Sequence, residues 1–154
     1  MITEVIDELD RKGLHYEVLA HSPTQTARQE ARATGVPNRQ VAKTIVLAVD
    51  DGYARAVLPA SERLDLEKAR VALGVDGSLR LATETELGLA YPAFELGAVP
   101  PFAGPAGDRV VIDRRLAEQD EVVLEAGTHS HSVKLRAGDL VRLSGAEVAD
   151  LTAD

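Results

Sequence analysis

The sequence contains no cysteine and few aromatic residues, and each absence excludes a class of protein. Without cysteine there is no disulfide framework, no thiolate nucleophile and no cysteine-based zinc or iron–sulfur site. Aromatic residues make up 3% of the 154 residues and hydrophobic residues 45%, so the core must be built from aliphatic side chains. A chain of this length can bury about 70% of its surface on folding. We therefore expect residues 1–154 to form a single domain.

Long apolar runs and an excess of basic residues are also missing. The longest apolar stretches, such as residues 44–49, are far too short to cross a bilayer. The N-terminal sequence MITEVIDELDRK is acidic and amphipathic, unlike a secretory signal peptide. With 25 acidic and 17 basic residues the net charge is −8, whereas DNA binding needs a dense basic face. We expect a cytoplasmic protein that binds neither membrane nor DNA. A small basic group that could contact a few phosphates comprises Arg28, Arg32, Arg39 and Lys43.

Several segments carry helix signals. Apolar residues at positions 2, 5, 6 and 9 follow the spacing of an amphipathic helix, which Gly13 ends. Ser22, followed by proline, predicts the N-cap of a helix that runs to about residue 34. Thr83 and Glu86 have the spacing of a capping box at the start of another helix. Short helices are also expected at residues 64–73 and 137–143.

Strand patterns interleave with these helices. Asp51-Gly52 predicts a tight turn between two neighbouring strands, because both residues tolerate positive φ. The expected strands are residues 14–21, 41–49, 53–58, 109–113, 121–127 and 131–135, with a further short strand before residue 83. An interleaved order with at least one hairpin predicts an α+β fold with a mixed sheet, not a strictly parallel doubly wound one.

The common catalytic motifs are absent. The chain has no G-x-S-x-G, Walker A, G-x-G-x-x-G or H-E-x-x-H sequence. His129 and His131 would share a face of a strand and could begin a metal site, but no third ligand follows at a matching spacing. A solvated turn that leads into a strand is the favoured interpretation of this pair. We expect no metal and no cofactor.

The loop GAVPPFAGPAG, residues 97–107, is a candidate for binding a reacting carbonyl. Its two consecutive prolines have fixed φ and no N–H, while Gly97 and Gly104 permit sharp changes of direction, and we expect positive φ at Gly97. The N–H groups of Ala98 and Val99 could then point at a ligand, as in an oxyanion hole. The alternative is a connection that only has to turn twice.

Lys43 stands near the start of an apolar strand. Strand alternation places it on the same face as residues 41, 45, 47 and 49, which are all aliphatic. A lysine on such a stripe either leads the strand out of the core, with its ammonium in water, or enters a pocket. The sequence pattern leaves both alternatives open.

Together these segments resemble one known family. The stretch VAKTIVLAVDDGYARAVLPASERLDLEKA resembles the lysine-bearing hairpin of the YbaK/prolyl-tRNA synthetase-associated domain. The preceding TQTARQEARATGV, the later GAVPPF and the closing AGTHSHSVKLRAGDLVRL occur in the family's order. The resemblance extends from about residue 14 to residue 143. It implies a mixed, partly barrel-like β-sheet with helices packed outside.

The resemblance also implies an activity. Members of this family act in trans as aminoacyl-tRNA deacylases, and are similar to the editing domain inserted in some bacterial prolyl-tRNA synthetases. They hydrolyse the ester between a wrong amino acid and the tRNA 3′ end. The implied substrates carry a small amino acid such as alanine, cysteine, serine or threonine, with tRNA-Pro as a candidate tRNA. The implied partners are the aminoacyl-tRNA 3′ end and, as a second candidate, a synthetase. A non-catalytic module that only binds aminoacyl-tRNA or a synthetase is the alternative.

The resemblance assigns roles to particular residues. Lys43 would contact the terminal adenosine or its phosphate, and Gly97, Ala98 and Val99 would present N–H groups to the ester carbonyl. One of the two histidines, His129 or His131, would face the pocket. The remaining implied substrate-binding residues are Val41, Ala42, Thr44, Pro100, Pro101 and Phe102.

Overall fold

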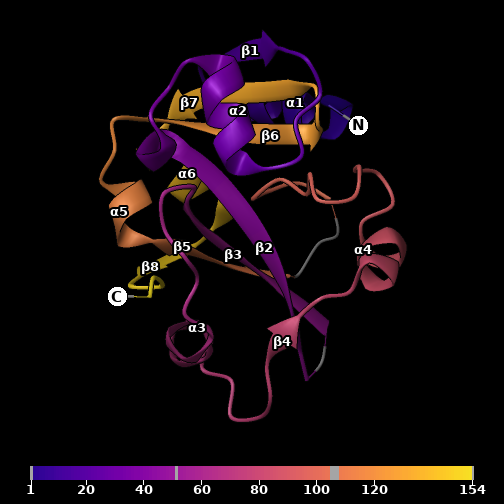
Figure 1. Ribbon diagram of the computed structural model, residues 1–154, viewed down its shortest axis with the longest axis vertical. Coiled ribbons are helices and arrows are strands. Elements are labelled where there is room, and N and C mark those ends of the chain that lie inside the picture. Colours follow the sequence, from indigo (N-terminus) through magenta and orange to yellow (C-terminus); the bar gives the residue numbers. More distant parts are fainter. Residues whose placement is uncertain (1, 51, 105–107, 154) are drawn as a thin grey trace.

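The computed structural model describes residues 2–50, 52–104 and 108–153, which form one mixed sheet with helices on both of its faces (Figure 1). The helices are α1 (Ile2–Arg11), α2 (Ala27–Thr34), the 3-10 helix η1 (Asn38–Gln40), α3 (Leu66–Leu73), α4 (Glu84–Ala90), α5 (Arg114–Ala117) and α6 (Ala137–Ser144). The strands are β1 (Tyr16–Ala20), β2 (Val41–Val49), β3 (Gly52–Pro59), β4 (Arg80–Leu81), β5 (Arg109–Asp113), β6 (Glu121–Thr128), β7 (His131–Arg136) and β8 (Glu147–Ala149).

The strand order is β1-β7-β6-β2-β3-β5-β8, and the short strand β4 also pairs with β2. The pairs β2–β3, β6–β7 and β1–β7 are antiparallel, whereas β2–β6, β3–β5 and β5–β8 are parallel. Within the described residues β1 and β8 are the two ends of this order and do not pair with each other, so the sheet stays open. The predicted α+β fold with a mixed sheet is confirmed.

Strand β2 diverges from its parallel neighbour β6 after a short stretch of pairing. β2 pairs with β6 only at Val41 and Ala42, and with β4 only at Leu47 and Ala48. In the described structure no strand pairs with the stretch between these two contacts on this edge. The segment that follows α4 approaches here, since the Glu95 N–H donates to the carbonyl of residue 127 in β6 at 2.9 Å. Lys43 therefore lies where two parallel strands diverge and a loop comes near both.

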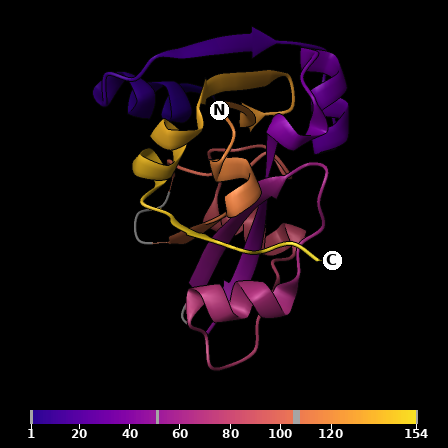
Figure 2. The ribbon, with the colours of Figure 1, turned by 90° about the vertical axis from the view of Figure 1, so that its left-hand side faces the viewer.

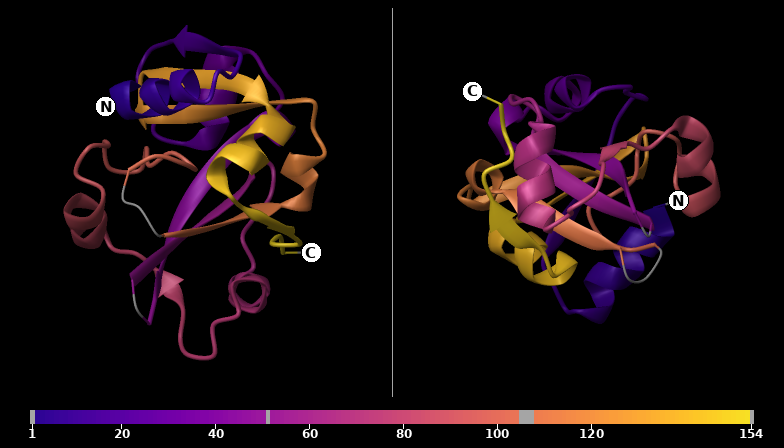
Figure 3. Two further views of the ribbon diagram at one scale, coloured as in Figure 1. Left: turned by 180° about the vertical axis from the view of Figure 1, so that it is seen from behind. Right: turned by 90° about the horizontal axis from the view of Figure 1, so that it is seen from below.

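Helices cover opposite faces of β6 because its side chains alternate. Val122 and Leu124 belong to a core cluster with Leu9 of α1, whereas Val123 packs in a second cluster with Ala31 of α2. Figure 2 shows α1 and α2 on opposite sides of these strands. The view from behind in Figure 3 shows α6 on the same side as α1. Glu125, two residues after Val123, accordingly lies on the α2 face.

Most predicted elements are present, but helix α2 starts later than predicted. The predicted hairpin forms between β2 and β3, although its turn residue Asp51 lies outside the described residues. The predicted capping box of α4 is confirmed at Thr83. The predicted N-cap Ser22 is wrong, because α2 begins after Thr26, whose hydroxyl accepts from the N–H of residue 29. The segment before it is instead bound to the β6–β7 turn, where the Thr24 N–H donates to the carbonyl of residue 129 at 2.9 Å.

Candidate functional site

A small pocket lies where β2 and β6 diverge. Its volume is about 60 Å³. Its lining residues come from α2 and the residues just before it, from β2, from the loop after α4 and from β6: Gln25, Ala27, Glu30, Ala42, Lys43, Thr44, Gly97, Val99 and Glu125. Five predicted site residues, which belong to two distant segments, thus line one pocket. We call it the Lys43 pocket.

Lys43 is half-buried at this pocket. Burial lowers the pKa of its ammonium, the nearby positive charges of Arg28 and Arg63 lower it further, and the carboxylate of Glu62 opposes the change. Its ammonium forms no ion pair or hydrogen bond within the described part of the chain. An anionic or hydrogen-bond-accepting group of a ligand would therefore meet a cation whose N–H donors are not bonded to the described residues.

The predicted loop contains one glycine in the expected conformation and one N–H group that already has an acceptor. Gly97 has φ 80°, the positive φ expected from the sequence. The Ala98 N–H donates to the Glu95 carbonyl at 3.0 Å, so the expectation that it points at a ligand is wrong. This bond closes a turn that leaves Gly97 and Val99 at the pocket. Their N–H groups donate to no acceptor in residues 2–50, 52–104 and 108–153.

A buried arginine fixes the shape of this loop. Arg55 of β3 is 1% exposed and donates to the carbonyl oxygens of Pro100 and Ala103, each at 2.6 Å. Its Nε also lies 2.7 Å from Asp108 Oδ2, which accepts from the Tyr91 hydroxyl at 2.7 Å. The Arg55 guanidinium lies 5.0 Å from the centre of the Tyr91 ring. We call Arg55, Asp108 and Tyr91 the Arg55 cluster. Sequence analysis missed it, although an arginine inside an apolar strand was the available signal.

Four predicted substrate-binding residues lie behind the pocket wall. Phe102 is 3% exposed and packs in the hydrophobic core with Val57 and Ile112, so it anchors the loop to the core. Val41 is fully buried against Ala31 of α2. Pro100 and Pro101 are buried as well. None of Val41, Pro100, Pro101 and Phe102 is among the lining residues of this pocket, and their contact with substrate stays a prediction.

The two histidines of the β6–β7 turn have different surroundings. His129 Nε2 lies 2.6 Å from the Leu96 carbonyl oxygen, and a Cβ at Gly97 would lie 3.5 Å from the His129 ring. His131 Nδ1 instead contacts the hydroxyls of Thr128 and Ser130 at 3.0 and 3.1 Å. His129 is thus the histidine beside the predicted loop.

Sequence analysis missed Glu30, a buried carboxyl group of the pocket. Glu30 is fully buried on α2, and its Oε2 accepts from the Ser132 hydroxyl at 2.5 Å. The same hydroxyl lies 2.9 Å from His21 Nε2. Burial raises the pKa of Glu30 to about 7, and the hydrogen bond from Ser132 opposes this rise. A glutamate inside an amphipathic helix gave no signal, because helices of this length commonly expose such residues.

Glu125 is the second buried carboxyl group. Burial, together with the negative charges of Glu30 and Glu95, raises its pKa to about 9. Its Oε2 lies 3.6 Å from His129 Nδ1. The sequence contained a usable signal here, since a glutamate in the middle of the apolar strand VVLEAG is unusual.

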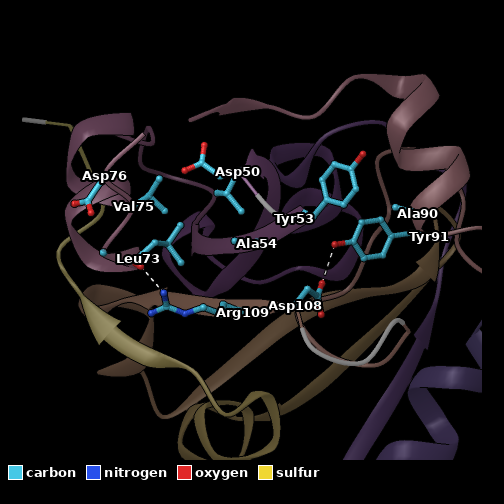
Figure 4. Close-up of a pocket in the computed structure, with 13 residues that line it drawn as sticks. Asp50, Tyr53, Ala54, Leu73, Val75, Asp76, Ala90, Tyr91, Asp108 and Arg109 are labelled. Carbon is cyan, nitrogen blue, oxygen red and sulfur yellow. Dashed lines mark hydrogen bonds between the residues drawn. The ribbon is translucent and has the colours of Figure 1, made fainter. Parts of the chain in front are cut away.

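A much larger cavity lies at the other end of the hairpin. It measures about 740 Å³ and shares no lining residue with the Lys43 pocket. Figure 4 shows Tyr53 and Tyr91 next to each other at one end of this cavity and Val75 and Asp76 at the other. No site residue expected from the sequence lines this cavity, so the larger of the two cavities is not the predicted site.

Neither a metal site nor a membrane segment is found in the described residues. No group of three or more histidine, aspartate or glutamate side chains there is arranged to bind a metal ion. The helices described here are all too short or too polar to cross a membrane.

Comparison with known proteins assigns the chain to a family. Residues 21–143 match the aminoacyl-tRNA editing domain, and the chain belongs to this family. Proline–tRNA ligase of Thermosipho africanus (strain TCF52B) is 35% identical over 89 residues, which are 57% of this chain and 15% of the ligase. The ligase of Thermosipho melanesiensis (strain DSM 12029 / CIP 104789 / BI429) is 29% identical over 105 residues, 68% of this chain and 17% of the ligase. The chain thus spans a small fraction of these relatives.

A solved structure supports the same relationship over the whole length. A protein with a proposed trans-editing role for prolyl tRNA synthetase has a TM-score of 0.89 and 30% sequence identity. The alignment covers 99% of this chain and 97% of that protein. The chain is therefore an aminoacyl-tRNA editing domain related to prolyl-tRNA synthetase editing.

Proposed function

We propose that this domain acts in trans as an aminoacyl-tRNA deacylase in the cytoplasm. Its substrate would be tRNA, in particular tRNA-Pro, that carries a small wrong amino acid such as alanine, cysteine, serine or threonine. The observation that carries the proposal is that Lys43 and Thr44 of β2 line one pocket with Gly97 and Val99 of the later loop. The pocket is small, which favours a small amino acid.

The proposed reaction needs no protein nucleophile. A water molecule attacks the carbonyl carbon of the ester, the bond to the ribose oxygen breaks, and that oxygen takes a proton as the free amino acid leaves. The ribose hydroxyl beside the ester can assist the water. The protein would contribute position and charge stabilisation, which can supply most of the reduction in barrier.

Each part of the Lys43 pocket has a role in this proposal. Lys43 would bind the terminal adenosine or its phosphate, and the N–H groups of Gly97 and Val99 would polarise the ester carbonyl. The Gly97 and Val99 N–H groups belong to residues that line the pocket and have no protein acceptor among the described residues, which supports this role. The Arg55 cluster would keep the loop in position. A synthetase that supplies mischarged tRNA is the proposed protein partner.

Multiple-turnover release of alanine from Ala-tRNA-Pro tests the proposal. We expect Lys43→Ala to fold normally and to lower kcat/KM about 10- to 100-fold, the range for removal of one hydrogen bond to a charged group. The matched control is Lys12→Ala, which removes an exposed lysine at the end of α1 and should retain the wild-type rate. Wild-type rates in Lys43→Ala would contradict the assignment. Tight binding of Ala-tRNA-Pro without turnover by the wild-type protein would favour the non-catalytic module.

A further inference from the structure

Three buried polar atoms close to the Lys43 pocket have no hydrogen-bond partner among the described residues. They are Glu30 Oε1, Glu125 Oε2 and His129 Nδ1. Glu30 and Glu125 line the pocket, and His129 Nδ1 lies 3.6 Å from Glu125 Oε2. We call Glu30, Glu125 and His129 the acceptor cluster. Buried polar atoms are normally paired, so three unpaired atoms in one place need an explanation.

All three atoms are hydrogen-bond acceptors when the carboxyl groups are ionised. His129 Nε2 lies 2.6 Å from the Leu96 carbonyl oxygen, which can only accept, so Nε2 must carry a proton. In the neutral imidazole Nδ1 is then the acceptor. Glu30 Oε2 already accepts from Ser132, which leaves Oε1 for another donor. With both carboxyl groups ionised, the cluster therefore presents only acceptors to a ligand.

The complementary ligand is a compact cation with several N–H donors. An alkylammonium group has three N–H donors and one positive charge. Burial favours the protonated forms of Glu30 and Glu125, and a cation bound between them would favour the ionised, negatively charged forms. Lys43 does not do so, because its ammonium forms no ion pair within the described residues.

We propose that Glu30, Glu125 and His129 bind the free α-ammonium group of the amino acid that is esterified to the tRNA. This inference rests on the proposed function for the identity of the ester and deepens it by defining the substrate class. The substrates would be esters of α-amino acids with an unblocked amino group. Esters of hydroxy acids and of N-acylated amino acids would be excluded.

The pocket dimensions agree with this substrate class. A cavity contains one water molecule from about 10–15 Å³ upward, so a volume of about 60 Å³ admits a group of a few heavy atoms. An ammonium group with a methyl side chain is of that size. The ester carbonyl, next to the α-carbon, would then lie toward Gly97 and Val99, whose N–H groups the proposed mechanism requires.

Binding of two matched adenosine derivatives tests the inference without any need for turnover. The probes are 3′-deoxyadenosine that carries an alanyl group through a non-hydrolysable 3′ amide, and the lactyl amide, in which a hydroxyl replaces the ammonium. We expect the alanyl compound to bind the wild-type protein about 10- to 100-fold more tightly by calorimetry, as for hydrogen bonds to a charged group. Equal dissociation constants, or no binding of either compound, would overturn the inference.

Variants then assign the preference to the cluster. Glu125→Gln and, separately, Glu30→Gln should lower the ratio of the alanyl to the lactyl binding affinity toward one. Circular dichroism checks that each variant folds normally. Glu84→Gln, an exposed glutamate in the first turn of α4, changes the net charge equally and should keep the wild-type ratio. A wild-type ratio in both pocket variants would show that these carboxyl groups do not bind the ammonium.

Hydrolysis of alanyl-tRNA and of lactyl-tRNA, in which a hydroxyl replaces the ammonium, separates this inference from the proposed function. If both tRNAs are hydrolysed at equal rates and the two probes bind equally, the deacylase proposal stands and the ammonium site is wrong. If the alanyl probe binds preferentially but neither tRNA is hydrolysed, the ammonium site stands and the deacylase proposal is wrong.

Discussion

The loop at residues 97–104 contacts two buried polar clusters that differ in how completely their atoms are paired. In the Arg55 cluster, the guanidinium donates to two loop carbonyls and to Asp108, and Tyr91 donates to the same carboxylate. In the acceptor cluster, each of three residues leaves one buried atom without a partner in the described structure. Each cluster contains a buried side chain, Arg55 or Glu30, beside partly exposed ones, so burial does not distinguish the two clusters.

The difference indicates different purposes. A buried polar network with all its partners in place makes a unique geometry more stable than its alternatives. A buried polar atom without a partner costs about 1–3 kcal/mol, a cost that a complementary ligand removes. The Arg55 cluster therefore fits a structural role in shaping the loop. The acceptor cluster fits a role that is completed only by a ligand.

Breaking the Arg55 cluster should give the largest effect. Arg55→Met would leave Asp108 and two loop carbonyls without their donor, and removal of one partner from a buried ion pair costs about 3–5 kcal/mol. We expect the free energy of unfolding, measured in urea, to fall by that amount. Arg80→Met is the matched control, because Arg80 pairs with Glu86 at the surface and should change stability far less. Similar losses in the two variants would contradict the structural role of Arg55.

Gly97→Val should mainly affect the reaction. Valine at φ 80° forces the loop to move, and loss of one aimed N–H donor costs about 2.7–4 kcal/mol of transition-state stabilisation, a rate loss of about 10²–10³. Single-turnover deacylation should fall accordingly, while tRNA affinity should change much less.

The control for Gly97→Val is Gly145→Val. Gly145 also has positive φ, 65°, and a Cβ there would meet no atom within 4 Å. It should lose stability from backbone strain but keep its deacylation rate when folded. Equal losses of rate and affinity in Gly97→Val would mean that the loop only binds substrate. If neither rate nor affinity falls, the loop only connects two elements of the fold.

Glu125 should make the protein less stable as the pH rises. Its pKa is raised from 4.5 to about 9 in the folded protein, which thus binds more protons than the unfolded chain between these values. Its contribution to stability is fully present below pH 4.5 and is lost at about 1.4 kcal/mol per pH unit as the pH rises toward 9. Glu30, with a pKa of about 7, adds a slope of the same sign that ends near pH 7.

Glu125→Gln tests this slope, because glutamine does not titrate. At pH 7 the variant should be more stable than the wild type by on the order of 3 kcal/mol, and the difference should grow toward pH 9, while near pH 4.5 the two proteins should be equally stable. Denaturation in urea across this pH range measures the difference. A wild-type slope in the variant would show that burial and the charges of Glu30 and Glu95 do not raise the pKa of Glu125.

Ser132→Ala should give the smallest effect. It removes the hydrogen bond to Glu30 Oε2, which opposes the rise in the pKa of Glu30, so this pKa should rise further. A loss of about 1 kcal/mol in stability is expected above pH 7, where the wild-type Glu30 is ionised, and less near pH 4.5, where it is protonated. Ser144→Ala, whose hydroxyl bonds to backbone carbonyls of α6, should lack this pH dependence.

Much of the fold could be predicted from the sequence because it depends on neighbouring residues. Strand alternation and a turn signal predicted the β2–β3 hairpin, and the spacing of Thr83 and Glu86 predicted the cap of α4. The positive φ of Gly97 was predicted from the local loop composition. The ordered set of motifs was sufficient to indicate the family, which the comparisons confirmed.

Only the tertiary structure decided which polar groups meet. Arg55 bonds to Asp108, Glu30 bonds to Ser132, and His129 rather than His131 lies beside Gly97. Each contact joins segments that are far apart in the sequence, and its formation depends on where β2 and β6 diverge and on how the loop is positioned between them. Local spacing contains no information about such distances. The sequence by itself determined Lys43 and the loop at residues 97–104 as candidates. The packing of α2 against β6 decided that Glu30 and Glu125 lie beside them, because side chains on a helix and on a strand line one pocket only when the two faces pack together.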